Sequence, residues 1–145
     1  MSTINYCLDT NVVSDIMRDQ KSVTRKMAEA LLSGSKLYIS SIVCYEIIRG
    51  LQATEHDRRL KKFLDIYSNL PHLYFDRYDM RAIIKAAEIY EQVRHGNIIE
   101  DSDIFIAAIA MVNDCTLVTA NEKHFERIEG LRRSEERRVG KECRS

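Results

Sequence analysis

The sequence lacks the residues and segments that mark disordered, membrane-spanning or exported proteins. It has one proline and five glycines in 145 residues, too few for long disordered regions. Its longest apolar run, residues 104–112, is far shorter than the roughly 20 residues that a membrane-spanning helix needs. The first residues, MSTINYCLD, contain no basic segment followed by an apolar one. We therefore expect a cytoplasmic protein with no membrane contact.

Cysteine and histidine are few and scattered. Cys143 lies in a charged C-terminal segment, and the remaining Cys7, Cys44 and Cys115 are an odd number in apolar surroundings. We therefore expect a reducing compartment and no disulfide framework. The four histidines lie far apart, and none stands at zinc-ligand spacing from a cysteine, which argues against zinc. Glycine-rich nucleotide-binding motifs are also absent from the sequence.

Residues 132–145, RRSEERRVGKECRS, differ from the rest of the chain because they are highly charged and have no apolar period. They resemble a translated cloning-vector tail, with a native basic tail as the alternative. We predict one domain over residues 1–131. That body has 16 basic and 19 acidic residues, a net charge of about −3, although the whole chain is neutral. Nucleic-acid binding would then need a local basic patch and a divalent metal.

Short β-like segments alternate with longer helical ones along the body. Strands are predicted at about residues 4–8, 36–39, 73–75 and 116–118, with a further short one near 126–128. Helices are predicted near 23–32 and 58–70. This alternation implies right-handed crossovers and a mostly parallel sheet covered on both faces. The predicted fold class is α/β, as a three-layer α/β/α sandwich.

Two further helices are clear from their patterns. The first can begin at a capping Asp79 and end at Gly96. Its predicted apolar face consists of Ile83, Ala87, Tyr90 and Val93. The second contains the apolar run 104–112, and we expect it to be buried on all sides.

Asp9 stands where the segment NYCLDTNVVSD changes from strand to helix. In open parallel sheets, ligands bind beyond the carboxyl ends of the strands, so Asp9 has the address of a site residue. The alternative is a helix cap, since Asp9, Thr10 and Asn11 all suit the first turn of a helix.

Glu46 has a similar address, about one turn inside the helix of LYISSIVCYEIIRG. A carboxylate among Val43 and Ile47 is costly to bury unless a positive group meets it. The alternative is an exposed position on an amphipathic helix, paired with Arg49 one turn further on.

Asp103 stands at the head of the predicted buried helix in IEDSDIFIAAIAMV. Asp101 or Ser102 could instead cap this helix while Asp103 complements the helix dipole, and Glu100 and Asp101 compete for any metal role. We prefer Asp103 because the residues three, four and seven positions further on are apolar. Asn121, in LVTANEKHF, is most simply a cap or turn residue.

Acidic residues that follow three strands should meet at one edge of the sheet, where they repel each other unless cations hold them. Carboxylates without soft ligands suit Mg²⁺ or Mn²⁺, which bind through one or two carboxylates and keep several waters. One or two such ions can generate hydroxide, align it for attack on phosphorus and stabilise the leaving oxygen. The pattern therefore predicts a phosphodiester-cleaving metal site.

Four segments also resemble the signature blocks of PIN-domain ribonucleases, in the right order between residues 4 and 131. They are LDTNV, ISSIVCYEIIRGL, EDSDIFIAAIA and LVTANEKHFERIEGL. The resemblance is strongest to VapC-type toxins of bacterial toxin–antitoxin pairs. Carried over to matching positions, it implies that Asp9, Glu46 and Asp103 are the catalytic and metal-binding residues.

The resemblance assigns supporting roles to further polar residues, namely Thr10, Asn11, Thr119 and Asn121. The family often has Asp at its fourth acidic position, where this chain has Asn121, so a second metal would bind weakly or only with substrate. The family also implies Mg²⁺-dependent cleavage of RNA such as tRNA, with Mn²⁺ as a substitute. It further implies homodimers and inhibition by a small antitoxin whose tail enters the cleft.

Basic residues near the four blocks are candidates for RNA contact, and Arg49 ranks first because it lies one turn from Glu46. The others are Arg18, Lys21, Lys123 and Arg127. Tyr45 could stack on a base, although packing is its simpler role. Two other functions compete. A haloacid-dehalogenase-like phosphatase would need a second Asp where Asn11 stands, and a catalytically silent PIN module would bind RNA or a protein without cutting.

Overall fold

The computed structural model describes residues 3–53, 57–75, 80–136 and 139. Its strands are β1 (Asn5–Leu8), β2 (Lys36–Ser40), β3 (His72–Leu73), β4 (Thr116–Val118) and β5 (Arg133–Ser134). Its helices are α1 (Thr10–Met17), α2 (Lys21–Leu32), α3 (Ser41–Leu51), α4 (Asp57–Asn69), α5 (Arg81–Val93), α6 (Asp101–Val112) and the 3₁₀ helix η1 (Glu122–Phe125).

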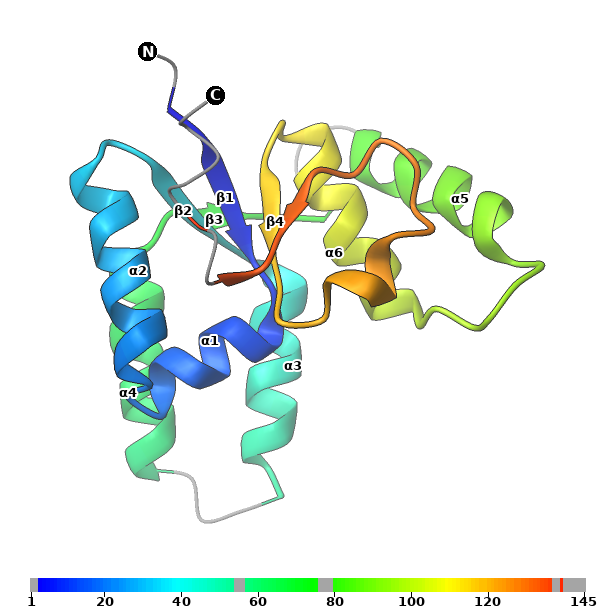
Figure 1. Cartoon of the computed structure of the whole chain (residues 1–145). Helices are drawn as coiled ribbons and strands as arrows, with labels where there is room; N and C mark the ends of the chain where they lie inside the picture. The colour runs from blue at the N-terminus through cyan, green and yellow to red at the C-terminus, as the bar shows by residue number, and fades with distance from the viewer. Residues whose placement is uncertain (1–2, 54–56, 76–79, 137–138, 140–145) are drawn as a thin grey trace.

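The sheet is parallel throughout the described chain, in the order β3-β2-β1-β4-β5. Cys7 of the central strand lies opposite Tyr38 of β2 and Leu117 of β4. Figure 1 shows α2 and α4 on one side of the sheet and α5 and α6 on the other. The predicted α/β/α sandwich is therefore confirmed. No helix among these residues is both long enough and apolar enough to cross a membrane.

Helix α6 is the buried helix that the apolar run predicts. Ile104 and residues 106–110 are at most 2% exposed. Three of these residues are alanines, whose small side chains let α5 and the sheet approach α6 closely. The core therefore holds the first turn of α6, which carries Asp103, in a fixed place.

The fifth strand lies later in the chain than the predicted 126–128. The N–H of Ile128 donates to the carbonyl of Phe125 (3.1 Å), so this segment forms a local turn. The edge of β4 pairs instead with β5: Leu117 N–H donates to Arg132 O (2.8 Å) and Thr119 N–H to Ser134 O (3.0 Å). The sheet thus extends beyond residue 131 into the segment set apart above. A vector origin for that segment stays a prediction.

The buried face of α5 also differs from the predicted one. Ala82, Ala86, Ile89 and Val93 are buried, whereas Tyr90 is 53% exposed and Ala87 is exposed. The face is turned by about one residue because the tightly packed α5–α6 contact accepts alanine more easily than tyrosine. The predicted cap Asp79 lies outside the described residues, and Gly96 lies just beyond the end of the helix.

Arg127 ties the end of α5 to the segment after η1. Its guanidinium donates to the carbonyl of Val93 (2.5 Å) and to that of Asn97. Gly96 leaves room for this side chain, because a Cβ there would collide with the guanidinium. Carbonyls at a helix end lack partners within the helix, and a cation suits the negative end of its dipole. Arg127, a candidate for RNA contact, is thus engaged in holding the loop before α6.

We expect Arg127→Ala to lower the free energy of unfolding by roughly 1–3 kcal/mol, because charge-assisted hydrogen bonds to two carbonyls are lost. Urea denaturation followed by circular dichroism measures this. Lys85→Ala, which removes a surface ion pair with Glu88, is the control and should cost less than about 1 kcal/mol. Equal losses in the two variants would contradict the role given to Arg127.

Candidate active site

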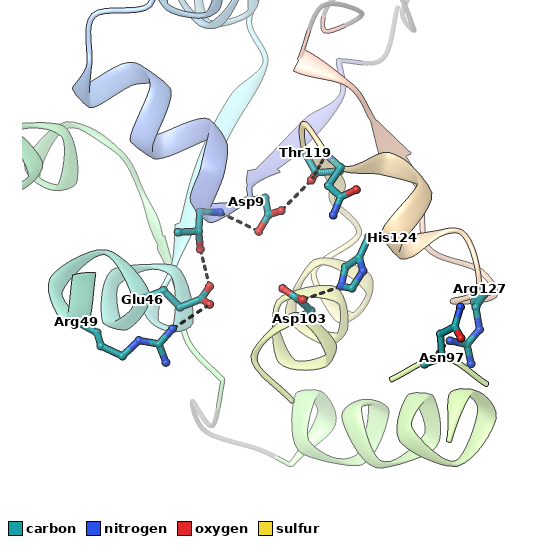
Figure 2. Close-up of polar contacts among 10 residues, drawn as sticks. Asp9, Glu46, Arg49, Asn97, Asp103, Thr119, His124 and Arg127 are labelled. Atoms are coloured by element: carbon teal, nitrogen blue, oxygen red, sulfur yellow. Dashed lines mark hydrogen bonds and ion pairs between the residues drawn. The ribbon is translucent and has the colours of Figure 1, made fainter. Parts of the chain in front are cut away.

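The three predicted acidic residues face one cleft beyond the carboxyl ends of β1, β2 and β4 (Figure 2). Asp9 directly follows β1, and Glu46 lies in α3, which follows β2. The expectation that each acid follows a strand is wrong for Asp103, because its helix α6 follows helix α5. It reaches the cleft because the N-terminal turn of the buried α6 opens there. The cleft has a volume of about 710 Å³, and Glu100, Asn121 and His124 also line it.

Asp9 is both a helix cap and a buried site residue, so its two predicted roles are compatible. It is 5% exposed and stands at the N-cap of α1. Its Oδ1 accepts from the N–H of Thr10 (2.8 Å), and its Oδ2 accepts from the hydroxyl of Thr119 (2.8 Å). The N–H of Asp9 donates to Val118 O (2.9 Å), which continues the β1–β4 pairing. The carboxylate is therefore held by the first residue of α1 and by the residue after β4.

Glu46 is held from α1. The hydroxyl of Thr10 donates to Glu46 Oε1 (2.5 Å), and the side chain of Glu46 is 13% exposed. The alternative pairing with Arg49 is present only as a long contact of 3.8 Å to Oε2, from a guanidinium that is 59% exposed. Thr10 thus links Asp9, through its N–H, to Glu46, through its hydroxyl.

Asp103 accepts a hydrogen bond from His124, a residue that no sequence pattern singled out. Nε2 of His124 lies 2.8 Å from Asp103 Oδ2, and both side chains are partly buried. The sequence offers only a weak signal for this contact. His124 lies in the fourth block, three residues after Asn121, but no nearby residue in the sequence indicates that it pairs with an acid. The capping alternatives for α6 are wrong, because Glu100 is the N-cap residue and makes no side-chain capping bond. Asp101 is exposed, whereas Glu100 lines the cleft.

The supporting polar residues connect the segments around the cleft. The N–H of Ala120 donates to Asn11 Oδ1 (3.2 Å), which joins α1 to the segment after β4. Thr119 is fully buried, and besides its bond to Asp9 its hydroxyl accepts from the N–H of Asn121 (3.0 Å). The predicted turn role of Asn121 agrees with its place before η1.

The cleft has an unfavourable concentration of negative charge. Burial raises the pKa of Asp9, the bonds from Thr119 and Thr10 lower it, and the charges of Asp103 and Glu46 raise it further. Burial also raises the pKa of Asp103, against the lowering effect of His124, and Glu46 and Glu100 add to the rise. A cation in the cleft would relieve both effects.

The donor set fits a hard divalent cation such as Mg²⁺ or Mn²⁺, since its oxygens come from carboxylates and amides. Within the described chain, no three Asp, Glu, His or Cys side chains are grouped so that they could hold an ion by themselves. Ions of this kind bind through one or two carboxylates and keep several waters, so they do not need three grouped protein ligands.

We expect Asp9→Asn to raise the free energy of unfolding at neutral pH in metal-free buffer. Because the pKa of Asp9 is raised in the folded state, its ionised form costs stability at pH values above that raised pKa. Wild-type stability should rise as the pH falls towards the ordinary Asp range, and below that range the two proteins should agree. Urea unfolding of both proteins in EDTA, at neutral pH and at a pH below the ordinary Asp range, measures this. A variant less stable than wild type at neutral pH would contradict it.

The chain resembles known proteins over most of its length. The family model of the PIN domain matches residues 6–131. Ribonuclease VapC1 of Methanocaldococcus jannaschii is 34% identical over 122 residues, which cover 83% of this chain and 79% of that protein.

Solved structures agree with the sequence relatives. VapBC2 of Rickettsia felis, bound to a DNA fragment from its promoter, aligns with a TM-score of 0.78 and 28% identity over 91% of this chain and 98% of that one. DNA-bound VapBC of Salmonella typhimurium aligns with a TM-score of 0.79 and 29% identity over 92% and 99%. The predicted resemblance to VapC-type PIN-domain ribonucleases is confirmed, and the chain belongs to the PIN domain family.

Proposed function

We propose that this chain is a Mg²⁺-dependent endoribonuclease that cleaves RNA phosphodiester bonds as the toxin of a toxin–antitoxin pair. The observation that carries the proposal is the buried carboxylate of Asp9, which faces Glu46 and Asp103 across one cleft. The PIN family and the VapC names of the relatives support RNA as the substrate. The family match also rules against the phosphatase alternative.

The metal would bind between Asp9, Glu46 and Asp103, through one or two of these carboxylates and its own waters. When bound, the ion supplies an activated water and stabilises the leaving oxygen. The chain's own residues prepare the site for it. Thr119 and the N–H of Thr10 hold Asp9 in place and favour its ionised form, and the hydroxyl of Thr10 orients Glu46. Asn121 offers an amide in place of a fourth carboxylate, so a second ion would bind weakly or together with the RNA.

The antitoxin proposal rests on the solved relatives, and the homodimer, tRNA and cytoplasm proposals rest on the family resemblance alone. Both structures described above are VapBC assemblies of a toxin with its antitoxin. We propose a small antitoxin as the partner of this chain and a homodimer as its own assembly. A tRNA is the proposed substrate class, and the cytoplasm the proposed location.

We expect Asp9→Asn to abolish metal-dependent cleavage while the protein stays folded. Changes to residues that only orient a metal ligand already cost about 10–100-fold, so loss of this carboxylate itself should lower the rate at least about 100-fold. The assay is cleavage of a total tRNA pool by antitoxin-free protein in Mg²⁺ or Mn²⁺, with an EDTA control and sequencing of new ends. Asp101→Asn, which changes an exposed acid two residues before Asp103, is the matched control and should cut normally. Equal cleavage by the two variants would refute the site, and no cleavage by folded wild type would favour the silent module.

A groove next to the cleft is suited to the RNA backbone. It lies between α1, α3 and α4, has a volume of about 490 Å³, and shares Thr10, Ser14, Arg18 and Glu46 with the cleft. Arg58, Arg59 and Lys62 of α4 line its far side. Cations beside an acidic cleft suit a polyanion with one phosphate at the metal and its neighbours on the basic residues.

The basic residues near the cleft differ in how free they are to bind phosphate. Arg18 pairs with Asp15 (3.1 Å) and Lys62 with Asp19. Among the described residues, the side chains of Arg58 and Arg59 have no hydrogen-bond or ion-pair partner. They therefore join Arg49 as proposed RNA contacts. Arg49 lies over the exposed ring of Tyr45, 5.2 Å from its centroid, and this pair could receive a base.

We expect the double variant Arg58→Gln, Arg59→Gln to bind single-stranded RNA more weakly and with less salt dependence. The loss of two phosphate contacts should reduce the slope of log K against log salt by about 1.4 units, at about 0.7 per contact for a single strand. Fluorescence anisotropy with an Asp9→Asn background, which prevents cleavage, measures both quantities. Lys85→Gln, Arg94→Gln on α5 makes the same charge change away from the groove and is the control. Equal slopes in the two double variants would exclude the groove as an RNA contact.

A further inference from the structure

His124 is placed so that it can control the orientation of Asp103. Its Nε2 lies 2.8 Å from Asp103 Oδ2, within the cleft shown in Figure 2. Only a hydrogen on Nε2 can make this contact attractive towards an ionised Asp103, so Nε2 is the donor. One carboxylate oxygen of Asp103 is therefore occupied, and Oδ1 remains for another ligand.

The imidazole itself is fixed by the structure around it. Its ring meets the ring of Phe125 edge to face, with centroids 5.2 Å apart and planes at 84°, and Phe125 is 1% exposed. The N–H of His124 donates to Asn121 O (3.1 Å) at the start of η1. The donor is thus anchored to the core and to the segment that follows β4.

Each of the three acids has one oxygen bound by a donor from a distant part of the chain. Thr119 binds Asp9, Thr10 binds Glu46, and His124 binds Asp103. The segment after β4, which carries Asn121 in place of a fourth acid, acts on the site twice, through Thr119 and through His124. An outer hydrogen-bond partner of this kind orients a metal-binding carboxylate.

We propose that His124 is a positioning residue that fixes the carboxylate of Asp103 for a divalent cation. The proposal rests on the proposed metal-dependent function. Without His124, the Asp103 side chain can rotate about its Cα–Cβ and Cβ–Cγ bonds, and the cation must then order it on binding. The effect should therefore be seen as weaker metal affinity, with or without RNA.

Mn²⁺ binding measured by isothermal titration calorimetry, without RNA, tests the proposal. His124→Asn should weaken Mn²⁺ affinity about 10-fold or more, because the shorter amide does not reach Oδ2. His124→Gln should retain most of the affinity, because its longer side chain carries an N–H to nearly the position of Nε2. Both variants keep a polar side chain, and their folding is checked by thermal unfolding. His95→Asn, on the exposed segment after α5, is the control and should bind like wild type.

A double-mutant cycle separates positioning from general damage. In an Asp103→Asn background, His124→Asn should cause no further loss of Mn²⁺ affinity, because the group that it positions is gone. Equal affinity of wild type and His124→Asn would overturn the role of His124 while leaving the metal site intact. Equal losses in His124→Gln and His124→Asn would also overturn it. A folded wild type that binds no Mn²⁺ would instead refute the proposed function itself.

Discussion

The arrangement of the molecule depends on holding carboxylates that repel each other at the end of a parallel sheet. Asp9 is buried beside Asp103 and Glu46, whose charges raise its pKa, and the charge of Glu46 also raises the pKa of Asp103. Two devices make this tolerable in the absence of a cation. Hydrogen-bond donors from separate segments bind one oxygen of each acid, and the parallel β1–β4 pairing keeps Asp9 and Thr119 at the same level. The fold therefore keeps several negative charges close together, and a bound divalent cation would offset their repulsion.

The position of Asp103 in the cleft is set by packing in the hydrophobic core. Helix α6 has almost no exposed residue after its first turn, so its direction is set by packing and not by solvent. Arg127 adds a second restraint, because it binds the carbonyl of Val93 at the end of α5 and that of Asn97 in the loop before α6. Residues that do not line the cleft thus decide where Asp103 lies, and packing changes in α5 or α6 should alter the geometry of the cleft.

Much of the fold and of the acidic cluster could be predicted from the sequence, because both follow local rules. Alternating patterns gave the parallel sheet, and strand ends directed attention to Asp9 and Glu46. The features that the sequence did not predict depend on contacts between distant segments. Strand β5 forms through backbone pairing in a charged segment, and the α5 face depends on which side chains α6 accepts. His124 and Arg127 act on residues 21 and 34 positions away, and no local pattern encodes such contacts.

The double role of Asp9 has a consequence for how such a protein can change over generations. Its side chain caps α1 and closes the β1–β4 junction through its shape and its acceptor oxygens, and an asparagine has nearly the same shape and still has one such oxygen. A single nucleotide change converts an Asp codon to an Asn codon. Under the proposed function, a catalytically silent allele therefore lies one nucleotide change away, and reaching it does not require passing through a misfolded protein.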